Sequence, residues 1–362
     1  MHVAVVNVPL RVSGDPHTWI TVPPQGYGGI QWVVAQLVDG LLDLGHQVSL
    51  LGAPGSPNGR PGLTVIEAAE PADMQAWLSR ARVDMVHDHS NGRVTRIGLA
   101  APLVSTHHLT DTPADPVNCV YLSAAQRAAA GATGPVVRLP VNPRRYRLAR
   151  RKRDYLLFLG RVSAHKGAYE AAAFAHAAGR RLVLAGPSWE REYLDRITRD
   201  FGTVVDVVGE VGGTHRLTLI AEAAAVLVLS QTVPGPWGDV WCEPGATVVS
   251  EAAASGTPVV ATANGCLAEI IPPVGTLVPY GSRFDPRYAA DVLAGLPGPK
   301  EVRRAALARW HHRRIARRYV DIYRRAIDGD RWPRGDGASN SRHRSRDCPG
   351  GNPSIQGFSR RA

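Results

Sequence analysis

Residues 243–260 read EPGATVVSEAAASGTPVV and place two carboxylates, Glu243 and Glu251, eight positions apart. Pro244-Gly245 predicts the start of a helix, and Ser255-Gly256 predicts its end ahead of a buried strand. The first N–H groups of such a helix have no partner within it and attract anions. The residues expected to form this anion site are Gly245, Ala246, Thr247 and Val248.

The spacing of the two carboxylates limits their chemistry. Eight residues of helix span ~12 Å, which is wider than the carboxylate pair of a glycosidase. The spacing fits two groups that bracket a nucleoside diphosphate sugar. One carboxylate would lie at the ribose and the other at the hexose, with the diphosphate between them.

A second motif precedes this one. Residues 160–167 read GRVSAHKG and directly follow an apolar strand, 155–159. Arg161 and Lys166 lie where a helix begins, so both can face the same ligand. When a nucleoside diphosphate departs, negative charge builds on its β-phosphate, and fixed cations stabilise that charge. The loop is not a P-loop, because the Gly-x4-Gly-Lys-Ser/Thr pattern is absent.

Two further features favour a ligand site. Residues 23–30 read PPQGYGGI, and Gly28 and Gly29 allow a ligand to approach the backbone closely. The histidines of 87–89 (HDH) and 107–108 (HH) follow predicted strands, where open α/β sheets bind ligands. These side chains could orient or deprotonate an acceptor hydroxyl, hold a metal, or serve only as structural histidines.

The chain alternates strands and helices twice, which predicts an α/β fold with two doubly wound parallel sheets. Its 362 residues are too many for one ordinary core. We expect strands at 3–8, 47–51, 63–66, 83–86, 103–105, 155–159, 182–185, 204–208, 226–229 and 259–261. The predicted units are an acceptor-side domain (1–142), an arginine-dense linker (143–153) interpreted as a solvated hinge, a nucleotide-sugar domain (154–300), a long helix (301–328) and a disordered tail (329–362).

Composition narrows the possible partners. The net charge is +11, which favours anionic ligands in general. The four cysteines form no C-x-x-C pair, which favours a reducing compartment. No apolar run is long enough to span a membrane, and the first residues resemble a strand rather than a signal peptide, so we expect a cytoplasmic protein without membrane insertion. Nucleic-acid binding is not expected, because the arginine-rich tail has almost no aromatic residues to stack on bases.

Taken together, these motifs resemble glycosyltransferase family 4, whose members have the GT-B fold; the resemblance covers about residues 1–327. It implies that Arg161 and Lys166 neutralise the diphosphate, that Glu251 binds the ribose and that Glu243 faces the donor sugar. Gly28 and Gly29 would approach the phosphates, and His108 would lie near the reacting centre. The residues expected beside the base are Gly209, Glu210 and Val211.

The resemblance also implies a reaction. Family members transfer a sugar from a nucleoside diphosphate, here of the UDP or dTDP type, with retention of configuration and without a metal or other cofactor. The acceptor would be an oligosaccharide or natural product, and residues 23–56 and 241–271 resemble enzymes of orthosomycin-type antibiotic biosynthesis. Many members have Phe-Gly where this chain has Gly245-Ala246, so the preference for a donor sugar is not carried over.

Three other functions are compatible with parts of the sequence. A GT-B epimerase would act on a nucleotide sugar without an acceptor. A metal-dependent hydrolase would use the histidines at 87, 89, 107 and 108. A sensor would bind the nucleotide sugar without turning it over.

Overall fold

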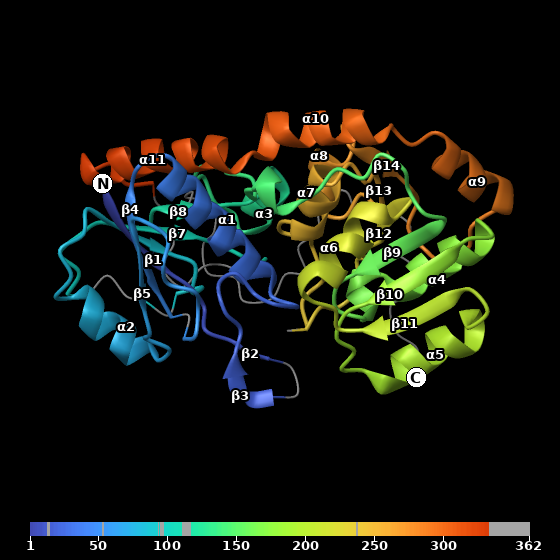
Figure 1. The fold of residues 1–362 in the computed structure, drawn as a ribbon, viewed down its shortest axis with the longest axis horizontal. Coiled ribbons are helices and arrows are strands. Elements are labelled where there is room, and N and C mark those ends of the chain that lie inside the picture. Colours follow the sequence, from blue (N-terminus) through green and yellow to red (C-terminus); the bar gives the residue numbers. More distant parts are fainter. Residues whose placement is uncertain are drawn as a thin grey trace.

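The computed structural model describes residues 1–12, 15–52, 54–92, 94, 98–110, 117–236 and 238–332. Two six-stranded parallel sheets lie side by side, each with helices on its faces, as Figure 1 shows. The predicted α/β architecture with two parallel sheets is therefore confirmed. Most of the predicted tail, 333–362, lies outside the described residues.

The first sheet has the strand order β5-β4-β1-β6-β7-β8. Its strands are β1 (His2–Val6), β4 (Gln47–Leu51), β5 (Leu63–Ile66), β6 (Met85–Asp88), β7 (Leu103–Thr106) and β8 (Cys119–Val120). Val3 at the centre pairs with Val48 on one side and Met85 on the other. Because both faces are covered, these strands are apolar along most of their length rather than alternating. A small hairpin, β2 (Arg11–Val12) with β3 (Asp15–Trp19), projects beside the sheet and was not predicted.

Helices cover the first sheet on both faces. One face packs against α1 (Gly29–Asp43), and the other packs against α2 (Pro71–Leu78). A short helix, α3 (Ala124–Ala129), follows β8, and its N-cap residue is Ser123, whose hydroxyl accepts the N–H of Gln126 at 3.0 Å. This capping bond satisfies one of the N–H groups that the first turn leaves free.

The second sheet has the order β11-β10-β9-β12-β13-β14. Its strands are β9 (Tyr155–Leu159), β10 (Arg181–Ala185), β11 (Val205–Gly209), β12 (Ala225–Val228), β13 (Val259–Ala261) and β14 (Gly275–Leu277). Its helices are α4 (Ala168–Ala177), α5 (Arg191–Phe201), α6 (Gly213–Glu222), α7 (Thr247–Ala254), α8 (Leu267–Ile270) and α9 (Pro286–Ala294). One face packs on α6 and α7 and the other on α4, α5 and α9. In both sheets the predicted strands match the observed ones to within two residues, whereas β8 and β14 were missed.

The long helix predicted over 301–328 is two helices, α10 (Pro299–Trp310) and α11 (His312–Ile327). His311 between them has φ −53° and ψ 125°, which breaks the helical path. The N–H of Val141 donates to the carbonyl of Trp310 at 2.7 Å, and the N–H of His312 donates to the carbonyl of Val141 at 2.9 Å. At this junction, hydrogen bonds to Val141, in the segment that joins the two sheets, therefore replace hydrogen bonds within a helix.

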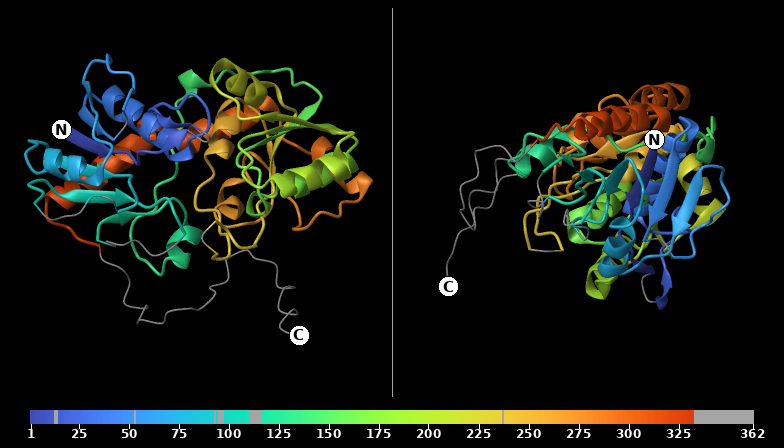
Figure 2. Two further views of the ribbon diagram at one scale, coloured as in Figure 1. Left: turned by 90° about the horizontal axis from the view of Figure 1, so that it is seen from below. Right: turned by 90° about the vertical axis from the view of Figure 1, so that its left-hand side faces the viewer.

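The two helices connect the two halves of the molecule. α10 packs on α7 beside the second sheet, and α11 packs along α1 beside the first sheet. Figure 2 shows α11, in red, running beside the blue α1. The apolar positions of α11, including Ile315 and Tyr319, belong to the core of the first sheet.

The arginine-dense stretch 143–153 is not only the solvated hinge surface that the sequence favours. Arg145 forms an ion pair with the buried Asp39 of α1, its Nε lying 2.8 Å from Oδ2. Arg147 pairs with Glu222 of the second sheet's helix α6. Trp332, within the predicted tail, is buried, and its indole N–H donates to the carbonyl of Cys119 at 2.9 Å. The tail prediction from residue 329 therefore began too early.

Candidate active site

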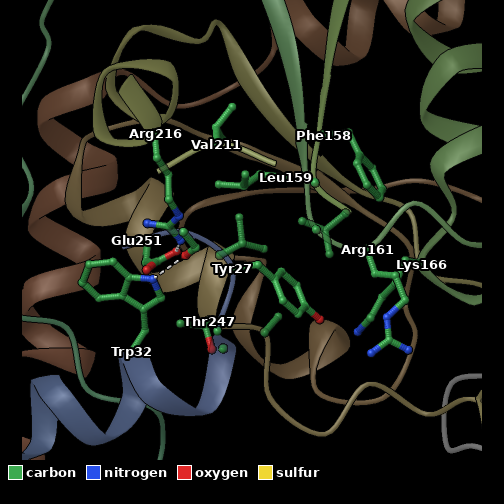
Figure 3. A pocket seen from close by; sticks show the side chains of 18 of the residues that line it. Tyr27, Trp32, Phe158, Leu159, Arg161, Lys166, Val211, Arg216, Thr247 and Glu251 are labelled. Carbon is green, nitrogen blue, oxygen red and sulfur yellow. Dashed lines mark hydrogen bonds and ion pairs between the residues drawn. The ribbon is translucent and has the colours of Figure 1, made fainter. Parts of the chain in front are cut away.

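A pocket lies at the carboxyl edge of the second sheet (Figure 3). The glycine loop before α1 and the first turn of that helix, from the other half of the molecule, cover it. Ligands of open α/β sheets bind at this edge, because the loops after parallel strands converge there. The pocket is lined by Gly26, Tyr27, Gly28, Gly29, Trp32, Phe158, Leu159, Gly160, Arg161, Lys166, Gly186, Glu210, Val211, Arg216, Leu227, Val228, Ser230, Glu243, Gly245, Ala246, Thr247, Val248 and Glu251.

Helix α7 begins at Thr247, with Ala246 as its N-cap residue. The predicted start at Pro244-Gly245 was therefore two residues early. Glu243 lies in the extended segment before the helix, so the ~12 Å helical spacing between the two carboxylates does not apply. Glu251 lies within the helix, and the segment from Gly245 to Val248 lines the pocket.

One end of the pocket is built around Glu243. Its carboxylate is almost completely buried, and Lys166 Nζ lies 2.8 Å from each of its oxygens. The hydroxyl of Ser230 and the indole N–H of Trp241 also donate to Oε2, at 2.9 and 3.1 Å. Burial raises the pKa of Glu243, but the Lys166 ammonium and these hydrogen bonds outweigh it and hold that pKa below its ordinary value. Glu243 is therefore an anion at neutral pH.

Arg161, the second predicted cation, is held by an aromatic ring. The Arg161 guanidinium lies over the Trp189 ring, 4.1 Å from its centroid, which is the geometry of a cation–π contact. The Nε of Arg161 is buried and makes no hydrogen bond to any residue that the structure describes. Arg161 and Lys166 appear together at one end of the pocket in Figure 3.

The other end of the pocket is built around Glu251. Oε1 accepts the hydroxyl of Tyr146 at 2.8 Å, and Oε2 accepts Nη2 of Arg216 at 2.6 Å. All three side chains are buried. Burial lowers the pKa of Arg216, but the Glu251 carboxylate raises that pKa by more. The net shift is upward, so Arg216 stays charged.

The glycine loop of the first sheet closes over the pocket. Gly28 has φ +154°, and a Cβ there would meet Ile20, Pro24 and Gln31 within 3.0–3.2 Å, so a side chain would not fit without displacement. The N–H of Tyr27 donates to Oε1 of Glu210 at 2.9 Å, from the opposite half of the molecule. Gly28 and Gly29 both line the pocket.

Most of the predicted site residues meet in this pocket, but Gly209 and His108 are not among its lining residues. Gly209 ends β11 one residue before Glu210, and its carbonyl accepts the N–H of Gly186 at 2.7 Å. The roles expected for the lining residues remain predictions.

The histidines form a buried network behind the first sheet's carboxyl edge. His87 lies within β6, and its ring is bonded to the Tyr323 hydroxyl at 2.6 Å and to the Thr106 hydroxyl at 2.7 Å. His89 and His108 are bonded to each other at 2.8 Å. Burial lowers the pKa of His87 to about 3 and the pKa values of His89 and His108 well below the ordinary range. Within the described ranges, no group of three or more His, Cys, Asp or Glu residues is arranged to hold a metal ion.

Sequence patterns did not identify Arg216, Trp32 or Tyr146. Arg216 follows β11 in the first turn of α6, so the rule that ligands bind after parallel strands could have selected it. Trp32 is in the first turn of α1, directly after the glycine loop, and its ring centroid lies 5.0 Å from Arg216 Cζ. Tyr146 lies inside the predicted linker, and no sequence signal shows that its hydroxyl meets Glu251.

The chain is similar in sequence and in structure to known glycosyltransferases. Residues 144–283 match the family model "Glycosyl transferases group 1". The crystal structure of AviGT4, a glycosyltransferase involved in avilamycin A biosynthesis, is 61% identical with a TM-score of 0.89, over 91% of this chain and 99% of that one. No curated protein matches the sequence.

Two more distant structures share the fold. Sucrose-phosphate synthase from Thermosynechococcus elongatus is 18% identical with a TM-score of 0.68, over 91% of this chain and 100% of that one. HepE from Anabaena, solved with UDP and glucose, is 15% identical with a TM-score of 0.62, over 89% of this chain and 98% of that one. These neighbours agree with a GT-B arrangement of the two sheets.

None of the helices in the described part of the chain is long and apolar enough to cross a membrane.

Proposed function

The chain belongs to the group 1 glycosyltransferases, and from this premise we propose that it moves a sugar from a nucleoside diphosphate to a hydroxyl of an oligosaccharide or natural product. The 61% identity to AviGT4 supports a place in the assembly of an orthosomycin-type antibiotic. The epimerase, hydrolase and sensor functions gain no support from these comparisons.

The observation that carries the proposal is the separation of charges along one pocket. The cations of Arg161 and Lys166 lie at one end of the pocket, and Glu251 lies at the other (Figure 3). The anion of Glu243 lies beside Lys166, 2.8 Å from its Nζ. A nucleoside diphosphate sugar has this order of groups: a sugar with hydroxyls, two phosphates, and a nucleoside. The proposed placement puts the donor sugar near Glu243, the phosphates between Arg161, Lys166 and the start of α7, and the ribose at Glu251.

The donor is proposed to be of the UDP or dTDP type. The same fold holds UDP and glucose in HepE. Glu210 and Val211 follow β11 at the nucleoside end of the pocket, where the base would lie.

The transfer is proposed to retain the anomeric configuration and to need no metal. As the bond from the anomeric carbon to the β-phosphate oxygen breaks, the electron pair goes to the phosphate, where Lys166 and Arg161 stabilise the new charge. The acceptor oxygen then bonds to the anomeric carbon from the same face, and its proton passes to the departing phosphate. These two side chains supply the positive charge that a divalent ion supplies in other enzymes.

A binding panel tests the donor class first. We expect a nucleoside diphosphate, UDP or dTDP, to raise the melting temperature, while magnesium alone does not. Stabilisation by magnesium but by none of UDP, dTDP, GDP and ADP would overturn the proposal.

A transfer assay then tests the reaction. With a donor sugar of known anomeric configuration and an oligosaccharide acceptor from an orthosomycin, we expect a product of the same configuration, formed equally well in excess chelator. An inverted product would contradict retention, and loss of turnover in chelator that is restored by magnesium would contradict metal independence.

A further inference from the structure

The excess positive charge of this chain is confined to its last part. Residues 1–298 contain 25 basic and 25 acidic side chains, so the whole net charge of +11 lies in residues 299–362. Of this part, the structure describes α10, α11 and the residues up to Trp332. Figure 1 shows the two helices running along one edge of the molecule, across both halves. The excess charge of the described residues is therefore concentrated along this edge.

A groove on this edge, here called the arginine groove, gathers five arginines. Its volume is about 650 Å³, which is within the range of ~300–1,000 Å³ for sites that bind small molecules. Among the described residues, it shares no lining residue with the candidate active-site pocket. Its arginines are Arg138, Arg309, Arg314, Arg317 and Arg318.

The carboxylates of the arginine groove leave most of this charge uncompensated. Glu269 pairs with Arg138, and Asp321 pairs with Arg324, a neighbour on α11 that does not line the groove. Three exposed side chains of the groove form no ion pair and no hydrogen bond with any described residue: Arg309, Arg317 and Arg318. These guanidinium groups are therefore available to a ligand.

The arginines of α11 stand on one face of that helix. Arg314, Arg317 and Arg318 are three and four positions apart, so their side chains are neighbours. The opposite face carries Ile315 and Tyr319 into the core of the first sheet. Like charges at these spacings destabilise a helix. An anion between them would replace this repulsion with attraction.

The groove takes its walls from both halves of the molecule. Glu269 belongs to α8 beside the second sheet, whereas the arginines of α11 stand on a helix that packs against the first sheet. Its concave shape lets several guanidinium groups face one small ligand from different sides. A guanidinium binds phosphate through two parallel N–H bonds, so linked phosphates could each engage a different arginine.

Two larger polyanions fit this surface less well. A membrane surface is bound through apolar side chains as well as charge, and among the described residues of α10 and α11 the one exposed large apolar side chain is Ile327, outside the groove. Single-stranded nucleic acid is bound through aromatic rings that stack on bases, and the one aromatic side chain described in the groove, Trp310, is buried. A compact anion of high charge remains.

We propose that the arginine groove binds an anion with two or more linked phosphate groups, at a site separate from the candidate active site. Arg317 and Arg318 of α11 and Arg309 of α10 contact its oxygens. This site goes beyond the proposed glycosyl transfer and does not depend on it.

Calorimetric titration of the full chain with inorganic tripolyphosphate tests the site. Saturating UDP is present to occupy the phosphate site proposed at Arg161 and Lys166, and the ionic strength is held constant without divalent ions. We expect tripolyphosphate to bind at least tenfold more tightly than orthophosphate, because several arginines act at once. Absence of tripolyphosphate binding would overturn the proposal, and so would sedimentation with anionic phosphatidylglycerol vesicles without any binding of tripolyphosphate.

A double variant assigns the binding to the groove. Arg317→Gln with Arg318→Gln should weaken tripolyphosphate roughly 10- to 100-fold, the scale of losing hydrogen bonds to a charged group. Arg287→Gln with Arg304→Gln removes the same charge at exposed positions that do not line the groove, and should bind like the wild type. Equal weakening by the two double variants would show a general charge effect and overturn the site. No weakening by the groove variant would place the binding elsewhere, including the arginines beyond Trp332, and would also overturn it.

Two further measurements separate the source of the phosphates and the fate of the proposed function. ATP replaces tripolyphosphate in a parallel titration: binding of either that is lost in the groove variant supports the site, and the tighter ligand shows whether a nucleoside adds to recognition. The melting temperature and UDP affinity of the groove variant should match the wild type. If UDP binds to neither protein, the proposed donor class fails, whereas the comparison of the two double variants still decides the groove.

Discussion

At the scale of single residues, Lys166 serves two anions. Its ammonium lies 2.8 Å from both oxygens of Glu243, and it is proposed to contact the donor phosphate as well. It also lies 4.2 Å from the centroid of the Trp241 ring, so the Glu243 carboxylate and this ring both hold it in the pocket. An electrostatic group that is already fixed needs little rearrangement when charge develops in the transition state.

Removing this ammonium should reduce catalysis more than binding. For Lys166→Ala we expect kcat to fall by roughly 10²–10³-fold, the scale for loss of one group that stabilises a developing anion. Glu243 would also lose the cation that lowers its pKa. Steady-state kinetics with a saturating donor measure the effect. Lys300→Ala, on the exposed first turn of α10, is the control, and near-wild-type turnover of Lys166→Ala would remove Lys166 from the mechanism.

The buried histidines predict how stability depends on pH. His87, with a folded pKa of about 3 against an ordinary value of 6.5, stays neutral while the unfolded chain binds a proton. The unfolded state therefore gains protons as the pH falls below about 6.5, and the free energy of unfolding drops by up to about 1.4 kcal/mol per pH unit for each such group. His89 and His108 act in the same direction.

Urea denaturation between about pH 7 and pH 5 measures this slope. His87→Gln should be less stable near neutral pH, because its bonds to Tyr323 and Thr106 are disturbed, but it should lose less stability on acidification than the wild type. His215→Gln, at an exposed position, should keep the wild-type slope. Parallel slopes for His87→Gln and the wild type would show that His87 is not held neutral in the folded protein.

The sequence predicted site residues that belong to compact motifs and missed those that depend on tertiary contacts. Lys166 stands out in a glycine-bounded loop directly after a predicted strand, and Glu243 stands out because it directly precedes the Pro-Gly that predicts a helix start. Arg216 and Tyr146 gain their meaning only when separate segments meet at Glu251. His108 was predicted at the reacting centre, but its ring is bonded to His89 and it does not line the pocket.

At the scale of elements, apolar runs predicted the strands well because each is buried on both faces. Tyr155–Leu159 and Val259–Ala261 were predicted with their observed bounds. The two-residue strand β8 and the three-residue strand β14 are too short to give a pattern. The break at His311 could not be predicted, because the helical periodicity continues across it and the bonds that replace the helix come from Val141.

The contact between α1 and α11 depends on Gly40. A glycine inside a helix is normally a cost, but a Cβ at Gly40 would meet the carbonyl of His312 at 2.6 Å and the methyl of Ala316 at 2.8 Å. The two helices therefore approach each other more closely than a side chain would permit.

Gly40→Ala should destabilise the protein although alanine favours helix formation. We expect the free energy of unfolding to fall by about 1–3 kcal/mol, the scale of overpacking a core. Chemical denaturation measures it. The control is Gly295→Ala at the end of α9, where the nearest atom to a new Cβ is at 3.4 Å and the change should be small. Equal or greater stability of Gly40→Ala would mean that α11 shifts freely along α1.

At the scale of the whole molecule, the two halves are joined differently at their two edges. Along α11 and α1 the joint is an apolar core. At the mouth of the pocket it includes two hydrogen bonds, from the N–H of Tyr27 to Glu210 and from the N–H of Gly213 to the carbonyl of Gln25 at 2.8 Å, and the contact of the Trp32 ring with Arg216. Exposed hydrogen bonds contribute little net stability, so the mouth can open while the core along α11 stays intact.

Opening at the mouth should therefore be visible in solution. We expect the wild-type radius of gyration to decrease when UDP is added, because a nucleotide between the halves favours the closed arrangement that the Tyr27–Glu210 bond stabilises. Glu210→Ala should have a larger radius than the wild type without nucleotide and should bind UDP roughly threefold to tenfold more weakly, since part of the binding energy then closes the cleft. Small-angle scattering and titration measure the two effects.

Glu192→Ala removes an exposed carboxylate on α5 and should match the wild type in both measurements. Superimposable scattering profiles for the wild type with and without UDP would exclude closure by the donor, and the Tyr27–Glu210 contact would then be a permanent part of the fold.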